Sequence, residues 1–118
     1  MKIAHISDIH IRNFKYHDVY NKIFDNLYSR LRDASPDIII NTGDTAHTKL
    51  QLSPAYFDIT AKFFTKLSEI APLHIIVGNH DLNLNNISNI DAITPIVNAL
   101  NNPNIHFHKK SEVFVLEE

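Results

Sequence analysis

The chain of 118 residues contains no cysteine, so it forms neither disulfide bonds nor metal sites built from thiolates. It has no excess of basic charge either, because 11 lysines and arginines stand against 13 aspartates and glutamates, for a formal net charge of -2. That balance predicts no strong non-specific affinity for nucleic acid, which needs a basic surface, and leaves room for a local basic patch. No hydrophobic run reaches the length of a membrane span, and the short apolar start does not resemble a signal peptide. We therefore expect an intracellular protein that makes no membrane contact.

Apolar residues and histidine are plentiful. The apolar content of 44% is typical of a globular protein, and the length fits one domain. Eight histidines are a high count for a chain without cysteine, and histidine is a common metal ligand and acid–base group. Each histidine is therefore a candidate for a functional site.

Periodic apolar residues predict the order of helices and strands. Short apolar or alternating stretches, typical of strands, occupy residues 2–6, 37–41, 73–77, 104–108 and 112–116. Spacings of three and four predict amphipathic helices over residues 16–31, 54–70 and 94–100, the second of which follows the helix-starting pair Ser53-Pro54. Alternation of strand and helix is the pattern of an α/β fold, with a mostly parallel sheet and flanking helices.

Polar residues with metal-binding side chains follow three of the predicted strands. They form the groups Asp8-Ile9-His10, Asn41-Thr42-Gly43-Asp44 and Gly78-Asn79-His80-Asp81. Ligands of open parallel sheets bind beyond the carboxyl ends of the strands, so the three groups should meet at one edge. Carboxylate, imidazole and amide oxygen suit manganese, iron, zinc or magnesium. Each group alone is weak evidence for a metal site, since a solvated loop with a capping aspartate has the same sequence pattern. Three such groups in order, each after a predicted strand, favour the metal site over that interpretation.

These motifs resemble the first three motifs of the calcineurin-like metallophosphoesterases. The opening His5-Ile6-Ser7-Asp8-Ile9-His10-Ile11, together with His47, is similar to SbcD-type DNA-repair nucleases and their phage recombination-endonuclease relatives. The resemblance implies a hydrolase with exonuclease and endonuclease activity in DNA repair and recombination. It also implies DNA as substrate, an SbcC-type ATPase as partner, a homodimer, and location in the cytoplasm (the host's, if a phage encodes the chain).

The resemblance also implies roles for single residues. Asp44 would bridge two divalent metal ions, preferably Mn²⁺, while Asp8 and His10 hold one ion and Asn79 holds the other. The same comparison makes His80 the general acid, Asp81 the residue that orients its ring, and His47 a residue that places the phosphate. Two such ions clamp the attacking and leaving oxygens of an in-line displacement.

The family completes its site with later histidines, one alone and two in a Gly-His-x-His run, and this chain has neither. His106 and His108 lack the glycine and are predicted to face solvent on their strand, so we do not assign them to this site. We expect residues 1–118 to be the N-terminal part of a metallophosphoesterase domain, an incomplete sandwich that is inactive or impaired by itself. The other histidines have structural interpretations: His5 packed below the site, His17 on the polar side of a helix, and His74 in a strand.

Two alternatives stay open. A protein or nucleotide phosphatase of the same superfamily shares all three motifs. A non-catalytic scaffold or dimerisation module is the other, because the helices over residues 54–70 and 94–100 resemble the dimer-forming pair of the nucleases. Tyr56, Phe57 and Ile59 on the first of these helices are either that interface or a wide core face.

Overall fold

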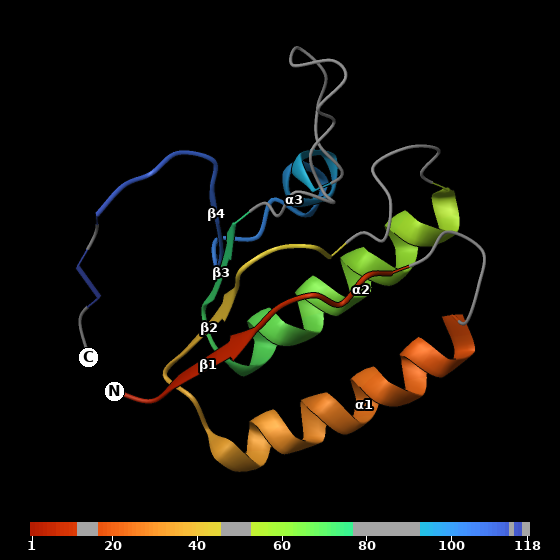
Figure 1. Cartoon of the computed structure of the whole chain (residues 1–118), viewed down its shortest axis with the longest axis horizontal. Helices are drawn as coiled ribbons and strands as arrows, with labels where there is room; N and C mark the ends of the chain where they lie inside the picture. The colour runs from red at the N-terminus through yellow and green to blue at the C-terminus, as the bar shows by residue number, and fades with distance from the viewer. Residues whose placement is uncertain (12–16, 46–52, 77–92, 114, 117–118) are drawn as a thin grey trace.

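The computed structural model describes residues 1–11, 17–45, 53–76, 93–113 and 115–116. Its elements follow the order β1 (Ile3–Ile6), α1 (His17–Ala34), β2 (Ile38–Asn41), α2 (Pro54–Ile70), β3 (Leu73–Ile76), α3 (Thr94–Leu100) and β4 (Ile105–His108) (Figure 1). All neighbouring strands pair in parallel, in the order β1-β2-β3-β4. The predicted α/β fold with a parallel sheet is therefore confirmed.

Local sequence explains where the helices begin and end. The Ser53 side chain accepts a hydrogen bond of 3.0 Å from the Tyr56 backbone N–H, and Pro54 occupies the first turn of α2. Helix α1 runs three residues beyond its predicted end and stops where Ser35 has a φ of 50° before Pro36. Asn101 adopts the left-handed conformation that closes α3.

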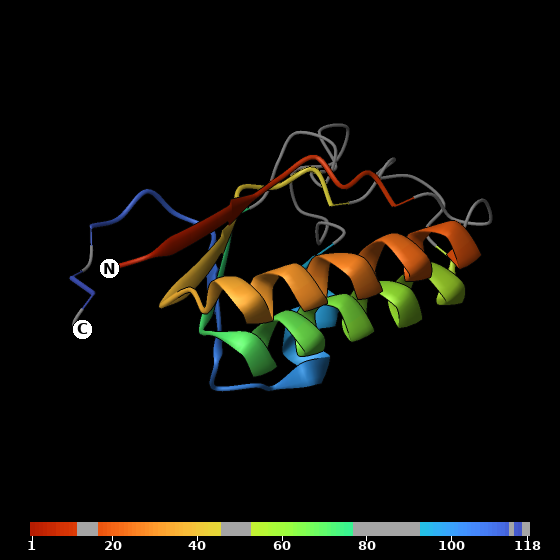
Figure 2. The ribbon, with the colours of Figure 1, turned by 90° about the horizontal axis from the view of Figure 1, so that it is seen from below.

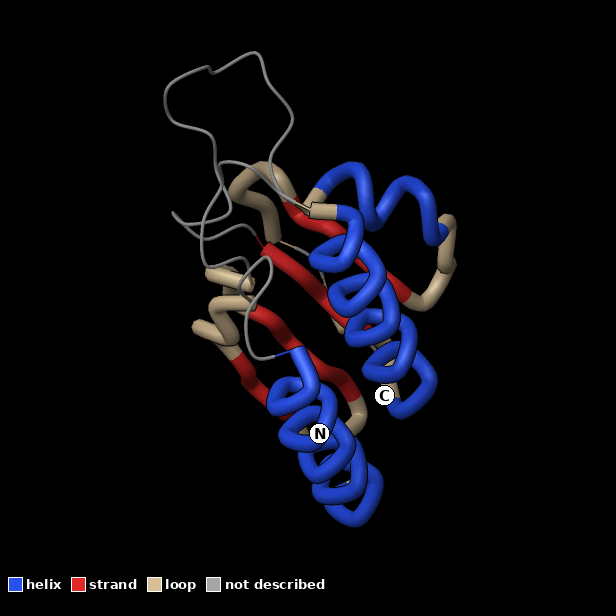
Figure 3. Tube along the Cα trace, turned by 90° about the vertical axis from the view of Figure 1, so that its right-hand side faces the viewer, coloured by secondary structure: helices blue, strands red, loops and turns tan. Residues whose placement is uncertain are grey.

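All three helices lie against the same face of the sheet (Figures 2 and 3). Buried side chains from α1, α2 and the covered face of the strands form the core, with Phe24 and Phe63 ring centroids 4.3 Å apart. Tyr56 is fully buried and Ile59 is 7% exposed, so these bulky residues of α2 belong to the core. The dimer-interface reading of these two residues is therefore wrong.

Among the described residues, no helix lies against the opposite face of the sheet. Because side chains alternate along a strand, this face presents Ile3 and His5 of β1, Ile38 and Ile40 of β2, His74 and Ile76 of β3, and His106 and His108 of β4. Ile3 and Ile76 are 51% and 41% exposed. His5 is also exposed and contacts Thr42, so the expectation that it packs below the site is wrong.

The strand predicted over residues 112–116 is absent from its described part. Residues 112, 113, 115 and 116 have no strand conformation, and Val113 and Val115 are 99% and 85% exposed. The segment instead turns from β4 across the helix-free face, where Glu112 and Leu116 line a pocket with Ile38 and His74. Val113 and Val115 therefore lack the burial on which a strand interpretation depends. Among the described residues, no helix is long and apolar enough to cross a membrane.

Candidate metal centre

The backbones of residues 7–11 and 42–45 run side by side beyond the carboxyl ends of β1 and β2. Backbone hydrogen bonds link the two segments beyond the paired strands: the N–H groups of Asp8, His10 and Ile11 donate to carbonyl oxygens of Gly43, Asp44 and Thr45 at 3.1, 2.9 and 2.7 Å. These bonds hold two of the three predicted ligand groups next to each other. The carboxyl edge of the sheet is thus the place where their side chains meet.

The same segments hold an unusual run of backbone conformations. Asp8, His10 and Asp44 have positive φ values of 58°, 54° and 55°, and Gly43 has a φ of 105°. Each left-handed residue other than glycine costs about 1–2 kcal/mol, although aspartate and histidine tolerate this region better than most. Three such residues within the nine positions 7–11 and 42–45 are typical of a functional site whose surroundings hold them in place.

The three strained residues aim their side chains at one point. One ligand atom from each of Asp8, His10 and Asp44 lies within 4.8 Å of the other two. The His10 Nε2 atom is 3.6 Å from Asp8 Oδ1. Two ligand atoms that are each about 2.1 Å from one ion can be at most about 4.2 Å apart, so this pair already has a separation that one ion can span. An imidazole and two carboxylates form a donor set suited to a divalent transition metal.

Neighbouring hydrogen bonds keep the Asp8 carboxylate ionised. The Ser7 hydroxyl donates to Asp8 Oδ2 at 2.6 Å, and this bond is the main reason that the pKa of Asp8 is lowered. Interactions with His10 and Asp44 lower the pKa further, whereas partial desolvation opposes them. The carboxylate is therefore in the metal-binding form at neutral pH.

Three residues hold the site in place from beneath and from the side. Asn41 and Thr45 are both fully buried; Asn41 accepts from the Gly43 N–H at 3.0 Å and donates to the Thr45 hydroxyl at 3.3 Å. Tyr20 of α1 donates its hydroxyl hydrogen to the His10 carbonyl oxygen at 2.7 Å. Sequence reasoning missed Tyr20, because its spacing marks it only as a core residue. Asn41 carried a signal, namely an amide at the end of a buried strand.

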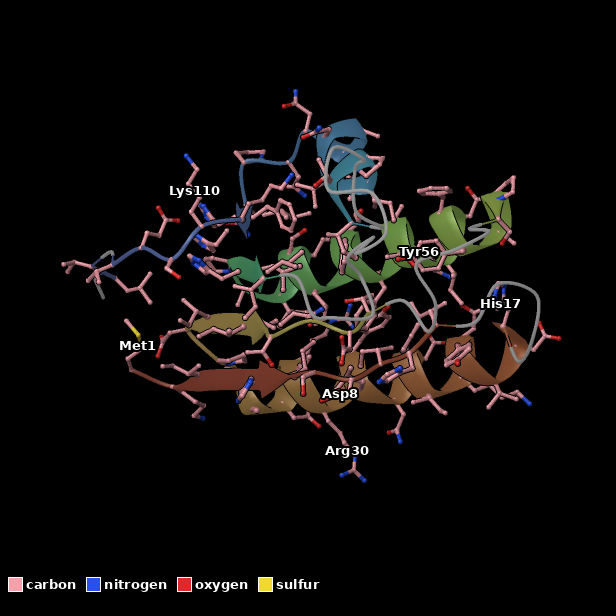
Figure 4. The ribbon with its side chains drawn as sticks, turned by 45° about the horizontal axis from the view of Figure 1, so that its top comes forward. Met1, Asp8, His17, Arg30, Tyr56 and Lys110 are labelled. Atoms are coloured by element: carbon pink, nitrogen blue, oxygen red, sulfur yellow. The ribbon has the colours of Figure 1, made fainter. Side chains whose placement is uncertain are left out.

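Among the described residues, the group contains no predicted site residue other than Asp8, His10 and Asp44. His47, Asn79, His80 and Asp81 lie outside the described residues, so their roles stay predictions. His106 and His108 lie on the helix-free face of β4, two strands away from β2 in the sheet order, and are not part of the group. In Figure 4, Asp8 lies beyond the end of β1, whereas Lys110, which follows β4, lies at the other edge of the sheet.

Comparison with known proteins identifies the family of the chain. Residues 1–116 match the calcineurin-like phosphoesterase family. The chain belongs to that family. Asp8, His10 and Asp44 thus stand at strand ends of a calcineurin-like phosphoesterase, a family that hydrolyses phosphoesters with divalent metal ions.

A relative with a similar sequence occurs in a mimivirus. Over 116 residues the chain is 44% identical to uncharacterized protein R555 of Acanthamoeba polyphaga mimivirus. The match covers 95% of this chain but 9% of the relative, so the chain spans a small part of that protein's length.

Proposed function

We propose that this chain supplies the first metal ligands of a phosphodiesterase that cleaves DNA, in the manner of SbcD-type nucleases. The observation that carries the proposal is the convergence of Asp8, His10 and Asp44 at the carboxyl edge of the sheet. Family membership adds the chemistry of phosphoester hydrolysis. The opening run from His5 to Ile11 and the position of His47 favour a nuclease within that family.

Each side chain has a defined task in this proposal. Asp8 and His10 would hold one metal ion, and Asp44 is proposed to share it with a second ion, for which Asn79 is the proposed ligand. When bound, the ions supply Lewis acidity and a hydroxide at neutral pH. His80 is proposed to donate a proton to the leaving oxygen, with Asp81 fixing the tautomer of its ring.

DNA, an SbcC-type ATPase and a second copy of the chain are the proposed partners. The sequence similarity to SbcD-type nucleases is the support for all three. A phosphatase that acts on monoesters is the second candidate, since Asp8, His10 and Asp44 serve either substrate class equally well.

A metal titration tests the site directly. Mn²⁺ should bind the 118-residue chain only weakly, because the later histidine ligands of the family are missing from it. Asp44→Asn should abolish this binding, because it removes a carboxylate from a group of three. His17→Gln, which changes a histidine at the start of α1, is the matched control and should bind Mn²⁺ like the unchanged chain. Equal Mn²⁺ affinity in Asp44→Asn would refute the metal site.

Hydrolysis assays separate the two candidate functions. In the protein encoded by the whole reading frame, Mn²⁺ should support cleavage of a DNA duplex end in preference to p-nitrophenyl phosphate, and His80→Asn should abolish it. Preference for the monoester would replace the nuclease proposal by the phosphatase. We expect no turnover by the 118-residue chain alone, because later histidine ligands of the family are missing from it. Robust turnover that disappears in His80→Ala would overturn that expectation.

A further inference from the structure

The turn of residues 42–45, which carries Asp44, follows directly after β2. The chain passes through Gly43, which has a φ of 105°, to Asp44, which has a φ of 55°. A left-handed conformation is unfavourable for a residue with a Cβ, so Asp44 keeps it only if neighbouring contacts hold the turn. Such contacts reach the turn from both faces of the sheet.

On the helix-covered face, one side chain holds the turn from beneath. Asn41 pairs with Ile6 in the sheet and its side chain is fully buried. The amide oxygen of Asn41 accepts from the Gly43 N–H at 3.0 Å, and the amide nitrogen donates to the Thr45 hydroxyl at 3.3 Å. These two bonds reach the turn on either side of Asp44.

On the helix-free face, His5 of β1 contacts the first residue of the same turn. His5 Nε2 lies 3.0 Å from the hydroxyl oxygen of Thr42, and the Thr42 backbone N–H donates to the Ile6 carbonyl oxygen at 3.0 Å. An imidazole nitrogen either donates to a hydroxyl or accepts from it, so this contact is a hydrogen bond in both tautomers of His5. His5 is exposed and Thr42 is half-buried, so removal of the bond leaves no cavity in the core.

We propose that His5 is a positioning residue of the metal centre, which acts on Asp44 through Thr42. The proposal rests on the role of Asp44 as a metal ligand in the proposed function. Glycine adopts many backbone conformations, so Gly43 by itself does not fix the direction of Asp44. The bond from His5 fixes the residue before Gly43, and Asn41 fixes the Gly43 N–H. Together they keep the Asp44 carboxylate within 4.8 Å of the ligand atoms of Asp8 and His10.

A direct role for His5 as a metal ligand is the alternative. Among the described residues, the group whose ligand atoms converge contains Asp8, His10 and Asp44, and His5 is not part of it. The His5 Nε2 atom is also the one that contacts Thr42. The two roles differ in one respect, because only a positioning role requires the hydroxyl of Thr42.

Mn²⁺ titration of the 118-residue chain, followed by the electron paramagnetic resonance of the free ion, tests the proposal. Thr42→Val exchanges the hydroxyl for a methyl group and should raise the Kd by about two- to tenfold, the range that loss of one hydrogen bond gives. His5→Ala should raise the Kd by a similar factor. The double variant should bind no more weakly than either single variant, because both substitutions remove the same bond.

Two further variants serve as controls. Thr42→Ser keeps the hydroxyl and should restore the Kd of the unchanged chain, which distinguishes loss of the bond from general damage at this position. His106→Gln changes another exposed histidine of the helix-free face, on β4, and should also bind Mn²⁺ like the unchanged chain.

Hydrogen exchange reports on the turn without any metal ion. The Gly43 N–H is bonded to Asn41, and in Thr42→Val it should exchange about two- to tenfold faster. The Ile39 N–H, which donates to the Pro72 carbonyl oxygen at 2.9 Å in the sheet, should keep its rate. A loss of overall stability would instead accelerate exchange at both amides.

The outcomes separate this proposal from the proposed function. If Asp44→Asn loses Mn²⁺ while Thr42→Val binds it as tightly as the unchanged chain, the positioning role of His5 is wrong and the metal site stands. A higher Kd in His5→Ala alone would also overturn the proposal and make His5 a ligand. Mn²⁺ affinity that is unchanged in Asp44→Asn would refute the metal site and this proposal together.

Discussion

Replacing Tyr20 with phenylalanine removes one hydroxyl group from α1 and leaves its ring in place. The lost bond is the one from the Tyr20 hydroxyl to the His10 carbonyl oxygen, 2.7 Å long. His10 has a φ of 54°, and the same carbonyl group belongs to that left-handed residue. Tyr20→Phe therefore weakens the support of a strained ligand without changing any donor atom of the metal centre.

The size of the effect follows from two energies. A hydrogen bond of this kind contributes a net stability of about 0.5–1.5 kcal/mol. The left-handed conformation of His10 costs about 1–2 kcal/mol, so loss of the bond is enough to shift its backbone toward relaxed conformations. If the full loss of about 1 kcal/mol opposes the binding conformation, the Kd for Mn²⁺ rises about fivefold, and a larger rise is not expected.

Isothermal titration with Mn²⁺ measures this change, because manganese favours carboxylate ligands. Tyr28→Phe is the control, since Tyr28 lies on the same helix with its ring in the core and should leave the Kd unchanged. Equal Kd values for Tyr20→Phe and the unchanged chain would refute the idea that α1 supports the ligand. A rise of a hundredfold or more would also refute it, since one hydrogen bond cannot supply that energy.

Three other perturbations test the core and the titrating groups. Phe63→Ala should lower the free energy of unfolding by about 3–5 kcal/mol in urea titrations, whereas Val19→Ala, at a position 51% exposed, should change it by less than about 0.5 kcal/mol. Ser7→Ala should raise the pKa of Asp8 in an NMR titration, because the Ser7 hydroxyl is the main cause of its lowering. Burial lowers the pKa of His74 below its usual 6.5, so below about pH 6.5 the unfolded chain binds more protons than the folded chain. The free energy of unfolding, measured with a chelator present, should therefore decrease as the pH is lowered through that range. His74→Gln should make this decrease smaller.

Most of the fold could be predicted from the sequence because the patterns are strong over whole elements. The apolar spacing of α1 and the Ser53-Pro54 start of α2 predict the bounds of these two helices to within a few residues of the observed ones. The prediction of a strand over residues 112–116 was wrong because apolar alternation within one segment does not say whether other residues cover that segment. The prediction that His5 packs below the site was wrong for a related reason. Parallel sheets are usually covered on both faces, whereas the described part of this one has a helix-free face.

The candidate site could be predicted in outline and not in detail. Asp8, His10 and Asp44 follow strands whose carboxyl ends share one edge, so topology alone brings them near one another. The positive φ values of Asp8 and His10 have no signal in the sequence, whereas Gly43 marks the turn before Asp44. The contact of His5 with Thr42 depends on strand register, which is set by packing across β1 and β2 rather than by either segment alone.

The sequential order β1-β2-β3-β4, with α1, α2 and α3 on one side of the sheet, determines how the site can change. In a doubly wound sheet, a ligand crevice forms where the strand order reverses and neighbouring connections leave toward opposite faces. The described sheet has no such reversal, so the segments that follow β1 and β2 must themselves shape the opening. Loops tolerate insertions far better than the strands they follow. Lengthening the connections from β1 to α1 or from β2 to α2 would therefore remodel substrate choice while the aromatic core beneath stays the same.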